Sequence, residues 1–352
     1  MPQHCIECFA FTPEELALPD VERRRLIAAR VKSVDSFAPG ALASKAPLGR
    51  ADEAAVLLAF LVLMGGPLLL LASGIACVIG GSWRELAMWC ALSVSLALHP
   101  LPSCAATMRK SWFARSLYRY FSYRFVWSGD ALETLQDAPA WFGAGPPHGV
   151  LPLANLLSIA AINTFCSRRF VGATASVVSR TPFLRYMTLF GCIDISAPSI
   201  RATAGAGTCV GLVPDGIAGI FKTRDADEVV YLEGRKGLAK LALRTGTPIL
   251  PAYSIGNTAV FGAWFDPFGV MEAASRRAQA AFFVYWGRFG LPLPRRVNIT
   301  MVFGTPILVQ KVAEPTGEQV DALHAEYLRA IEALFDTHKA ALGWGHKRIR
   351  IA

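Results

Sequence analysis

An uncharged apolar stretch near the N-terminus dominates the hydrophobic pattern of the chain. Residues 54–83 contain no charged side chain. At 1.5 Å per residue, a helix of this length crosses a hydrocarbon core of roughly 30 Å. A second apolar run, residues 86–101, is shorter and ends among prolines. The pattern predicts a transmembrane helix and a second helix that returns or lies re-entrant, with a buried helical pair as the alternative.

Basic residues flank the apolar region on both sides. Arg23, Arg24 and Arg50 precede it, and Lys110 and Arg115 follow it. Positive flanks favour the cytosolic side of a membrane. Since a single crossing would translocate one basic flank, the charges favour a hairpin over residues 54–104. Residues 1–53 lack the apolar core of a signal peptide and are interpreted as a cytosolic tail and linker.

Aromatic and basic residues alternate in the next segment, residues 105–138. Trp112, Phe113 and Tyr118 are interleaved with Arg115 and Arg119. Aromatic rings with cations that extend toward water are typical of the membrane interface. The segment is therefore predicted to be interfacial, although a partly buried amphipathic helix has the same pattern.

From about residue 139 the pattern changes to short apolar runs rich in Val, Ile and Ala, separated by turns and helical stretches. This alternation predicts an α/β domain over residues 139–352. The expected strands are 170–178, 208–213, 248–255 and 297–303, with a helix over 236–245. Thr316 and Gln319 form a capping-box pattern before an apolar periodicity that continues to Leu342, which predicts a long closing helix.

Composition narrows the class of protein. The 352 residues are 53% hydrophobic and 17% charged, with a net charge of +9. This is too apolar for an ordinary soluble enzyme and favours a membrane surface or a phosphorylated substrate over nucleic acid. Cys5 and Cys8 form an isolated Cys-x-x-Cys pair without further ligands at zinc-site spacing, so no metal site is expected.

One histidine stands where chemistry is expected. His148 lies in Gly-Pro-Pro-His-Gly, where glycines allow close backbone approach and prolines stiffen the turn. A rigidly held imidazole with an ordinary pKa near 6.5 can remove a proton from a hydroxyl group. His148 is therefore the candidate general base.

Several sequence blocks carry a family resemblance. Residues 147–152, Pro-His-Gly-Val-Leu-Pro, resemble the H-P-H-G or E-P-H block of the type-2 acyl-CoA:diacylglycerol acyltransferase family. Further blocks follow in family order. They are 180–185 (R-x-P-F-x-R), 213–218 (V-P-G-G), 234–238 (R-K-G-F), 248–251, 286–290, and the residues around His338 and Trp344.

The resemblance implies a fold, an activity and a location. It implies a glycerolipid-acyltransferase-like α/β domain of the lysophospholipid acyltransferase-like superfamily. It implies transfer of a fatty acyl group from acyl-CoA to diacylglycerol, which yields triacylglycerol and free coenzyme A. Acyl-CoA is then a co-substrate, and no bound cofactor is expected. Members of the family are endoplasmic-reticulum membrane proteins that can associate with lipid droplets, and the basic flanks place the catalytic domain in the cytosol.

Three positions depart from the related patterns. Asp215 replaces the first glycine of V-P-G-G, and Gly219 stands where the family often has glutamate. We hypothesise that the Asp215 carboxylate partly replaces the missing one, with an ordinary turn aspartate as the alternative. Leu153 occupies the place of the aspartate in the superfamily's H-x-x-x-x-D block, so Asp215 or Glu233 is expected to orient His148.

Basic and glycine residues in the same blocks are candidates for substrate binding. Arg235 and Lys236 precede a helix that begins near Gly237, where side-chain charge and backbone N–H groups suit the phosphates of coenzyme A. A solvated helix face is the alternative. The remaining candidates are Arg180, Arg185, Gly216 and Arg288.

The proposed chemistry leaves the acceptor open. Direct transfer requires His148 and no covalent intermediate, and the chain lacks the Gly-x-Ser-x-Gly block of lipases. Monoacylglycerol, a fatty alcohol or a lysophospholipid could be acylated by the same chemistry. The alternative of another class is an inactive lipid-binding or droplet-scaffold protein.

Overall fold

A nine-stranded sheet organises the chain in the computed structural model, which describes residues 3–34, 38–101, 108, 110–129, 131, 138–166, 168–222, 227–264, 266–278 and 283–352. The strand order is β2-β1-β3-β12-β9-β4-β7-β5-β6. The strands are β1 (Gln3–Glu7), β2 (Lys32–Val34), β3 (Arg124–Ser128), β4 (Phe142–Ala144), β5 (Phe170–Thr174), β6 (Cys192–Asp194), β7 (Cys209–Leu212), β9 (Ile249–Ile255) and β12 (Thr300–Phe303). From β9 to β6 all neighbours are parallel, while β12 runs antiparallel to β9.

Two small sheets complete the strand inventory of the described residues. In one, β8 (Glu228–Val230) pairs with β13 (Ile349–Ile351), and in the other β10 (Gly262–Ala263) pairs with β11 (Tyr285–Trp286). The second pair lies beside the apolar N-terminal helices, where it contributes to the surface considered below.

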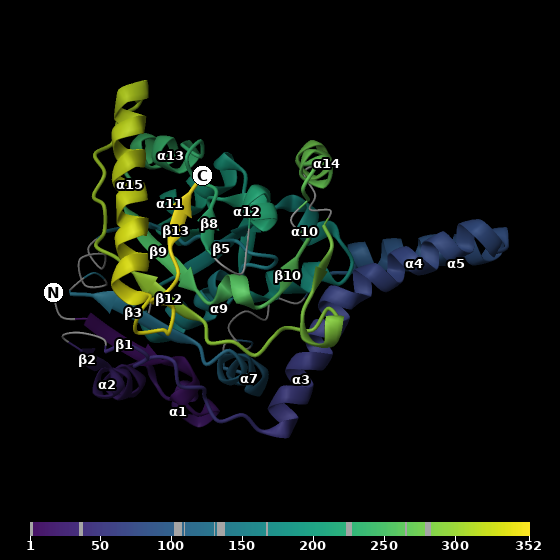
Figure 1. Cartoon of the computed structure of the whole chain (residues 1–352), viewed down its shortest axis with the longest axis horizontal. Coiled ribbons are helices and arrows are strands. Elements are labelled where there is room, and N and C mark those ends of the chain that lie inside the picture. The colour runs from purple at the N-terminus through teal and green to yellow at the C-terminus, as the bar shows by residue number, and fades with distance from the viewer. Residues whose placement is uncertain are drawn as a thin grey trace.

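Helices cover both faces of the central sheet (Figure 1). The helices are α1 (Pro13–Ala17), α2 (Asp20–Arg30), α3 (Arg50–Phe60), η2 (Leu61–Gly65), α4 (Gly66–Gly80), α5 (Trp83–Leu98), α7 (Trp112–Tyr120), α9 (Leu153–Ala161), η3 (Ile162–Cys166), α10 (Ser176–Arg180), η4 (Leu184–Phe190), α11 (Ala197–Gly205), α12 (Gly216–Lys222), α13 (Gly237–Thr245), α14 (Val270–Ala278) and α15 (Gly317–His338), with short turns η1 (Cys8–Ala10), η5 (Asn257–Ala259) and η6 (Arg288–Gly290).

A separate hydrophobic core lies on each face of the sheet, because successive side chains of a strand point to opposite faces. Phe125 and Met301 point into the core that α7 and α9 cover, while their neighbours Val126 and Val302 point into the core beneath α13 and α15. All seven residues of β9 are buried, as expected of a central strand covered on both faces. The predicted α/β fold is confirmed.

Most elements predicted within the α/β region are present. The expected strands at 208–213, 248–255 and 297–303 correspond to β7, β9 and the shorter β12, and the helix at 236–245 corresponds to α13. The strand expected over 170–178 was partly wrong, because it ends at Thr174 and α10 begins at Ser176.

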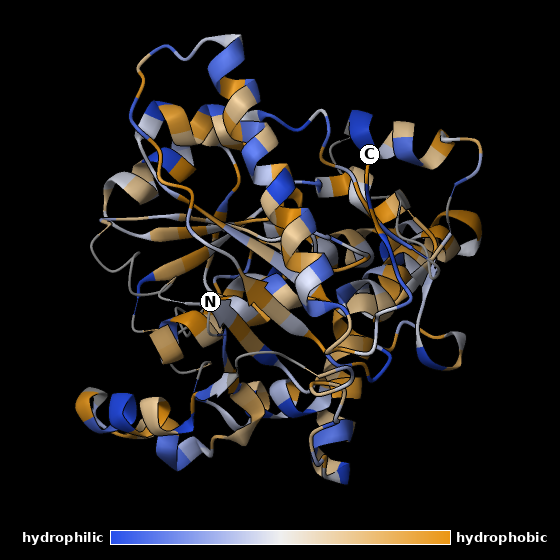
Figure 2. Ribbon diagram, turned by 60° about the vertical axis from the view of Figure 1, so that its left-hand side comes forward, coloured by the Kyte–Doolittle hydropathy of each residue, from blue (hydrophilic) through white to orange (hydrophobic). Residues whose placement is uncertain are grey.

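The closing helix has its predicted start. Thr316 and Gln319 form the reciprocal capping box, and hydrophilic and hydrophobic residues alternate along α15 (Figure 2). The helix ends at His338, so Leu342 lies in the turns that follow rather than in the helix.

The apolar N-terminal region is helical. α3, η2 and α4 form one continuous helix, Arg50–Gly80, that is long and apolar enough to cross a membrane. Ser82 and Glu85 cap α5, which packs against α4 because the Trp89 indole N–H donates to Leu70 O (3.1 Å) and Ser73 Oγ (3.0 Å). The pair projects from the sheet domain (Figure 1).

Two segments outside 139–352 contribute to the sheet and to its core. β1 pairs with β3 over five residue pairs, so residues predicted as an N-terminal tail complete the sheet. Leu117, Tyr118, Tyr123 and Phe125 are at most 3% exposed, so these members of the predicted interfacial segment belong to the core. The parts of that segment and of the predicted hairpin at 102–107, 109, 130 and 132–137 lie outside the described residues.

Candidate active site

The turn that carries His148 begins at the C-terminal end of β4, in the middle of the parallel strands. Gly145 N–H donates to Leu212 O of β7 (3.0 Å), and Ser254 N–H of β9 donates to Pro146 O (2.9 Å). The first residues of the turn are therefore fixed between the two neighbouring strands. Sites of open α/β folds commonly lie at such carboxyl ends.

The imidazole of His148 is oriented by a backbone carbonyl. Nδ1 lies 2.8 Å from Gly149 O. Because a carbonyl oxygen can only accept, Nδ1 carries the proton, and Nε2 keeps the lone pair that a base needs. Burial lowers the pKa of His148 below its ordinary 6.5, although the hydrogen bond to Gly149 O opposes this shift. The neutral form of the ring is thus favoured.

Neither carboxylate expected to orient the ring has that role among the described contacts. Asp215 Oδ2 accepts a 2.8 Å hydrogen bond from the backbone N–H of His148, not from its ring. The Glu233 side chain is exposed, and its backbone carbonyl faces His324 Nε2 at 3.2 Å. The structure therefore places Asp215 at the site as an anchor for the turn and leaves Glu233 outside it.

The Asp215 carboxylate occupies the space above Gly219. A Cβ at position 219 would lie 2.2 Å from Asp215 Oδ2, so any larger residue there would displace the carboxylate. Asp215 has no exposed surface, and Oδ1 lacks a hydrogen-bond partner among the described residues. Burial raises its pKa from 3.8 to about 7, against the hydrogen bond from His148 N–H and the charge of Arg235.

Asn257 is a further site residue, which the sequence did not indicate. Its Nδ2 donates to Pro147 O (3.2 Å) and His148 O (2.9 Å), and its Oδ1 accepts from Ala154 N–H (3.1 Å). The 2% exposed side chain thus joins the His148 turn to the first turn of α9. A Gly-Asn pair after a strand normally signals a turn, so local pattern alone could not separate this role from ordinary loop chemistry.

Gly149 explains why the turn tolerates this clamp. Its φ of +59° lies in the left-handed region, and an added Cβ would stand 3.1 Å from Asn257 Nδ2. Glycine adopts this conformation without strain and leaves room for the amide.

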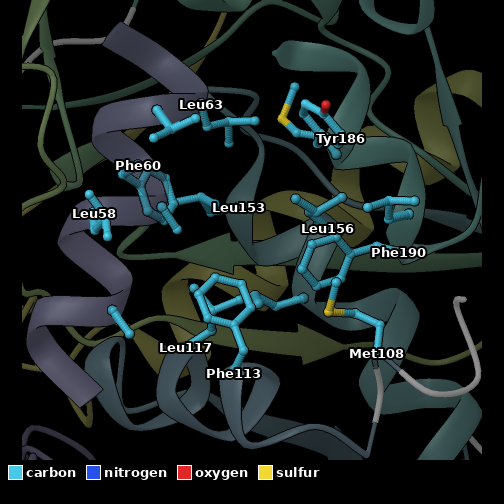
Figure 3. A pocket seen from close by; sticks show the side chains of 16 residues that line it. Leu58, Phe60, Leu63, Met108, Phe113, Leu117, Leu153, Leu156, Tyr186 and Phe190 are labelled. Carbon is cyan, nitrogen blue, oxygen red and sulfur yellow. The ribbon is translucent and has the colours of Figure 1, made fainter. Parts of the chain in front are cut away.

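A cavity of about 420 Å³ adjoins the turn through α9 (Figure 3). Its lining side chains are apolar apart from the hydroxyl of Tyr186. They come from α3 and η2, α7, α9 and η4, together with Met108. Leu153, the first residue of α9 and the position of the missing superfamily aspartate, is part of this wall. His148 itself does not line the cavity, so the cavity suits an apolar chain whose polar end lies elsewhere.

Two predicted substrate-binding residues, Arg185 and Arg288, contact the apolar helices. Arg185 is 9% exposed, and its Nη1 donates to Leu96 O of α5 (3.1 Å). Arg288 Nη1 pairs with Glu53 Oε1 of α3 (2.6 Å) and lies 3.4 Å from the Tyr120 hydroxyl. Both guanidinium groups thus bond to the apolar helices, and their role in substrate binding stays a prediction.

The other predicted binding residues lie at different distances from the turn. Gly216 follows Asp215 directly and begins α12 with a φ of +52°. Arg235 is close enough to Asp215 to influence its pKa. Lys236, which precedes Gly237 at the start of α13, pairs with Asp321 at 2.7 Å. Arg180, at the end of α10, is exposed.

Comparison with known proteins places this geometry in a family. The family model described as diacylglycerol acyltransferase matches residues 86–349. Diacylglycerol O-acyltransferase 2-like protein 6 of Bos taurus is 28% identical over 260 residues, which cover 67% of this chain and 77% of the relative. Diacylglycerol O-acyltransferase 2 of Mus musculus is 29% identical over 260 residues, which cover 67% and 66%.

A solved structure also resembles the fold. It is the 1-acyl-sn-glycerophosphate acyltransferase PlsC from Thermotoga maritima, with 13% identity, a TM-score of 0.41, and coverage of 81% of this chain and 97% of that one. The match to the family model includes His148, Asp215 and most of the central sheet, and it is sufficient to assign the family. This chain therefore belongs to the diacylglycerol acyltransferase family.

Proposed function

We propose that this chain transfers a fatty acyl group from acyl-CoA to the hydroxyl group of diacylglycerol, with His148 as the general base. The observation that carries the proposal is a rigid imidazole with an available Nε2 at the start of the helix that walls an apolar cavity. Family membership and the names of the relatives support the same substrates.

In the proposed step both substrates are bound together. Nε2 of His148 takes the hydroxyl proton as the acceptor oxygen bonds to the thioester carbonyl carbon. The tetrahedral adduct then collapses, the C–S bond breaks, and the proton passes from Nε2 to the departing coenzyme A sulfur. Atoms and charge balance without a bound cofactor or a covalent enzyme intermediate.

The residues around His148 have positioning roles in this proposal. Asn257 and the Asp215 carboxylate fix the backbone on either side of the imidazole, and the carbonyl of Gly149 selects the tautomer. Asp215 thereby replaces the carboxylate that Gly219 lacks. Arg235 is the candidate for the phosphates of coenzyme A, because it combines a permanent charge with proximity to Asp215.

We place α4 and α5 in a membrane. Their exposed side chains include Leu69, Val78, Ile79 and Trp83, each at least 70% accessible, which would be costly in water. With the basic flanks on the cytosolic side, the sheet domain faces the cytosol. The endoplasmic reticulum is the proposed membrane, with lipid droplets as a second location.

The decisive experiment measures acyl transfer from labelled oleoyl-CoA to diacylglycerol in membranes that contain wild type, His148→Ala or His346→Ala. His346 is exposed and is not part of the turn, so it controls for loss of a histidine. Triacylglycerol from wild type and His346→Ala, but not from His148→Ala at equal expression, is expected.

The same membranes test the acceptor. Equal synthesis by His148→Ala would refute the base assignment. If no variant makes triacylglycerol but wild type acylates monoacylglycerol, a fatty alcohol or a lysophospholipid, that compound and not diacylglycerol is the acceptor. Binding to droplets without turnover of any acceptor would favour the inactive scaffold.

A cavity variant tests where the apolar chain binds. Leu156 lies in α9 and lines the cavity. Leu156→Trp should reduce the use of long acyl chains more than that of short ones, because the indole fills part of the cavity. An unchanged chain-length profile with stearoyl-CoA and octanoyl-CoA would remove the cavity from acyl-donor binding.

A further inference from the structure

A second group of exposed apolar side chains lies outside the hairpin. They occur at and just before the start of α14 and around the β10–β11 pair, and they are defined here as the 264–291 patch: Trp264, Phe268, Val270, Val284, Phe289 and Leu291. Phe268 is 88% and Phe289 81% exposed, and the others are between 46% and 67% exposed. Single exposed apolar residues are ordinary, whereas a group with two almost fully exposed phenylalanines indicates a contact surface.

The 264–291 patch is fixed to the apolar helix Arg50–Gly80. The Tyr285 hydroxyl donates to Met64 O at 2.8 Å, and Pro292 lies 3.5 Å from the position of a Cβ at Gly65. The ion pair of Arg288 with Glu53 adds a third link. The 284–291 part of the patch is therefore linked directly to the helix proposed to enter the membrane.

Backbone hydrogen bonds join parts of the patch. Trp264 N–H donates to Val284 O at 2.8 Å, which extends the β10–β11 pair, and Gly287 N–H donates to Leu291 O at 2.8 Å. The helix that follows Phe268, α14, lies on the side of the domain from which α4 and α5 project (Figure 1).

Phe289 has a backbone conformation that packing does not explain. Its φ of +58° is unusual for a residue with a Cβ and costs on the order of 1 kcal/mol. The ring gains no burial within the domain in return. It lies 5.3 Å from the Arg288 guanidinium, and an aromatic ring beside a cation is suited to the boundary between lipid headgroups and acyl chains.

We infer that the 264–291 patch contacts the membrane lipids beside the hairpin and holds the catalytic domain against the bilayer. The inference rests on the proposed membrane placement of α4 and α5. Contact between the patch and the bilayer buries the exposed apolar side chains of the patch. It also keeps the cavity wall formed by α3 close to the lipid that contains the acceptor. A bilayer is favoured over a protein partner because the chain that carries Val284, Phe289 and Leu291 is held against an apolar helix long enough to cross a membrane.

Tryptophan quenching tests the inference. Full-length Phe289→Trp and Leu308→Trp are reconstituted in phosphatidylcholine vesicles with or without bromine atoms on the acyl chains, and each emission is compared with that of wild type. Leu308 is a matched control, since it is 71% exposed and follows Ile307, which pairs with the opposite end of β9 from Asn257. Phe268→Trp provides a second reporter if Phe289→Trp folds poorly.

The expected result is that the emission added at position 289 shifts to shorter wavelength and is lost in brominated vesicles, whereas that added at 308 is retained. Unquenched emission at 289 and 268, with quenching of the native tryptophans of α5, would overturn the inference and leave the hairpin in lipid. A blue shift without quenching would mean that the indole is buried against protein, in the same chain or in a second copy, and would overturn it as well.

The measurement needs no substrate, so it is independent of the chemistry. Triacylglycerol synthesis by the same preparations reports on the acyltransferase proposal separately. If wild-type emission is not quenched at all, both the membrane placement and the inference fail, whatever the activity.

Discussion

Exchanging the residues at positions 215 and 219 tests how the His148 turn is held. Gly219→Ala places a Cβ 2.2 Å from Asp215 Oδ2, far inside van der Waals contact. The carboxylate must therefore move, and the 2.8 Å hydrogen bond from His148 N–H is lost or distorted. Asp215→Gly removes the same acceptor without steric conflict. Both single substitutions should misplace the imidazole.

The magnitude follows from two terms. Overpacking at a buried position costs about 1–3 kcal/mol. A hydrogen bond to a charged group contributes about 1.5–3 kcal/mol. If this free energy is needed to hold His148 in its reactive position, at about 1.4 kcal/mol for each tenfold change in rate, either single variant should be slower by roughly tenfold to a hundredfold.

The double variant Asp215→Gly/Gly219→Glu recreates the pattern that the family often has. Its glutamate Cβ enters space that the Asp215 carboxylate has left, so the steric conflict disappears and a carboxylate returns to the same region. Activity should exceed that of both single variants, Asp215→Gly and Gly219→Glu. This is the interaction that a double-mutant cycle detects between neighbouring residues.

The assay is the rate of triacylglycerol synthesis from labelled oleoyl-CoA, normalised to enzyme amount. Gly205→Ala is the control, because a Cβ there meets nothing within 4 Å. The reasoning is refuted if Gly219→Ala is as active as Gly205→Ala. It is also refuted if the losses of the two single exchanges simply multiply in the double variant.

Three further predictions concern the same turn. The apparent pKa of the base limb of kcat/KM should lie below 6.5, because burial favours neutral His148; a limb at or above 6.5 between pH 5 and 8 would contradict this. For Asp215→Asn, the gain in Tm over wild type should grow as pH rises from about 4 through about 7. The folded carboxyl has its pKa raised from 3.8 to about 7, so wild type loses stability over this window, by up to about 4 kcal/mol, while the amide does not titrate. A difference that is constant with pH would contradict the buried charge. Asn257→Ala should lower kcat by roughly tenfold or more through loss of three hydrogen bonds, with little change in the KM for acyl-CoA; a change in KM alone would assign Asn257 to substrate binding.

The sequence predicted those parts of the fold whose apolar pattern is compatible with only one type of secondary structure. β9 is buried throughout, and α15 combines a capping box with an apolar stripe, so each pattern fits one type of element. The segment containing Tyr118 and Phe125 was different. Aromatic rings beside arginines are compatible with a membrane interface and with a protein core. The pairing of β3 with β1 and β12 shows that Phe125 lies in the core.

The site was predictable as far as its chemistry is carried by a short block. The block around His148 made it the candidate base, which stays a prediction, and Asp215 was expected near it and does bond to its backbone N–H. Which atom orients the ring could not be predicted, since Gly149 O is a backbone group available in any sequence. Asn257 depends on a contact across more than a hundred residues, which has no local signal.

Arg185 and Arg288, two predicted substrate-binding residues, connect the apolar helices to the sheet domain. Arg185 holds the end of α5 and Arg288 holds the start of α3, while η4, α3 and α9 share the wall of one cavity. An arginine in a sequence indicates that its charge will have a partner, but it does not say which group the partner is. Here the partners belong to the apolar helices. The His148 turn leads directly into α9, so the position of the apolar helices, the shape of the apolar cavity and the position of the proposed base depend on one another. If His148 is the base as proposed, the helix α3–η2 is a structural part of the active site, because it shares the cavity wall with α9.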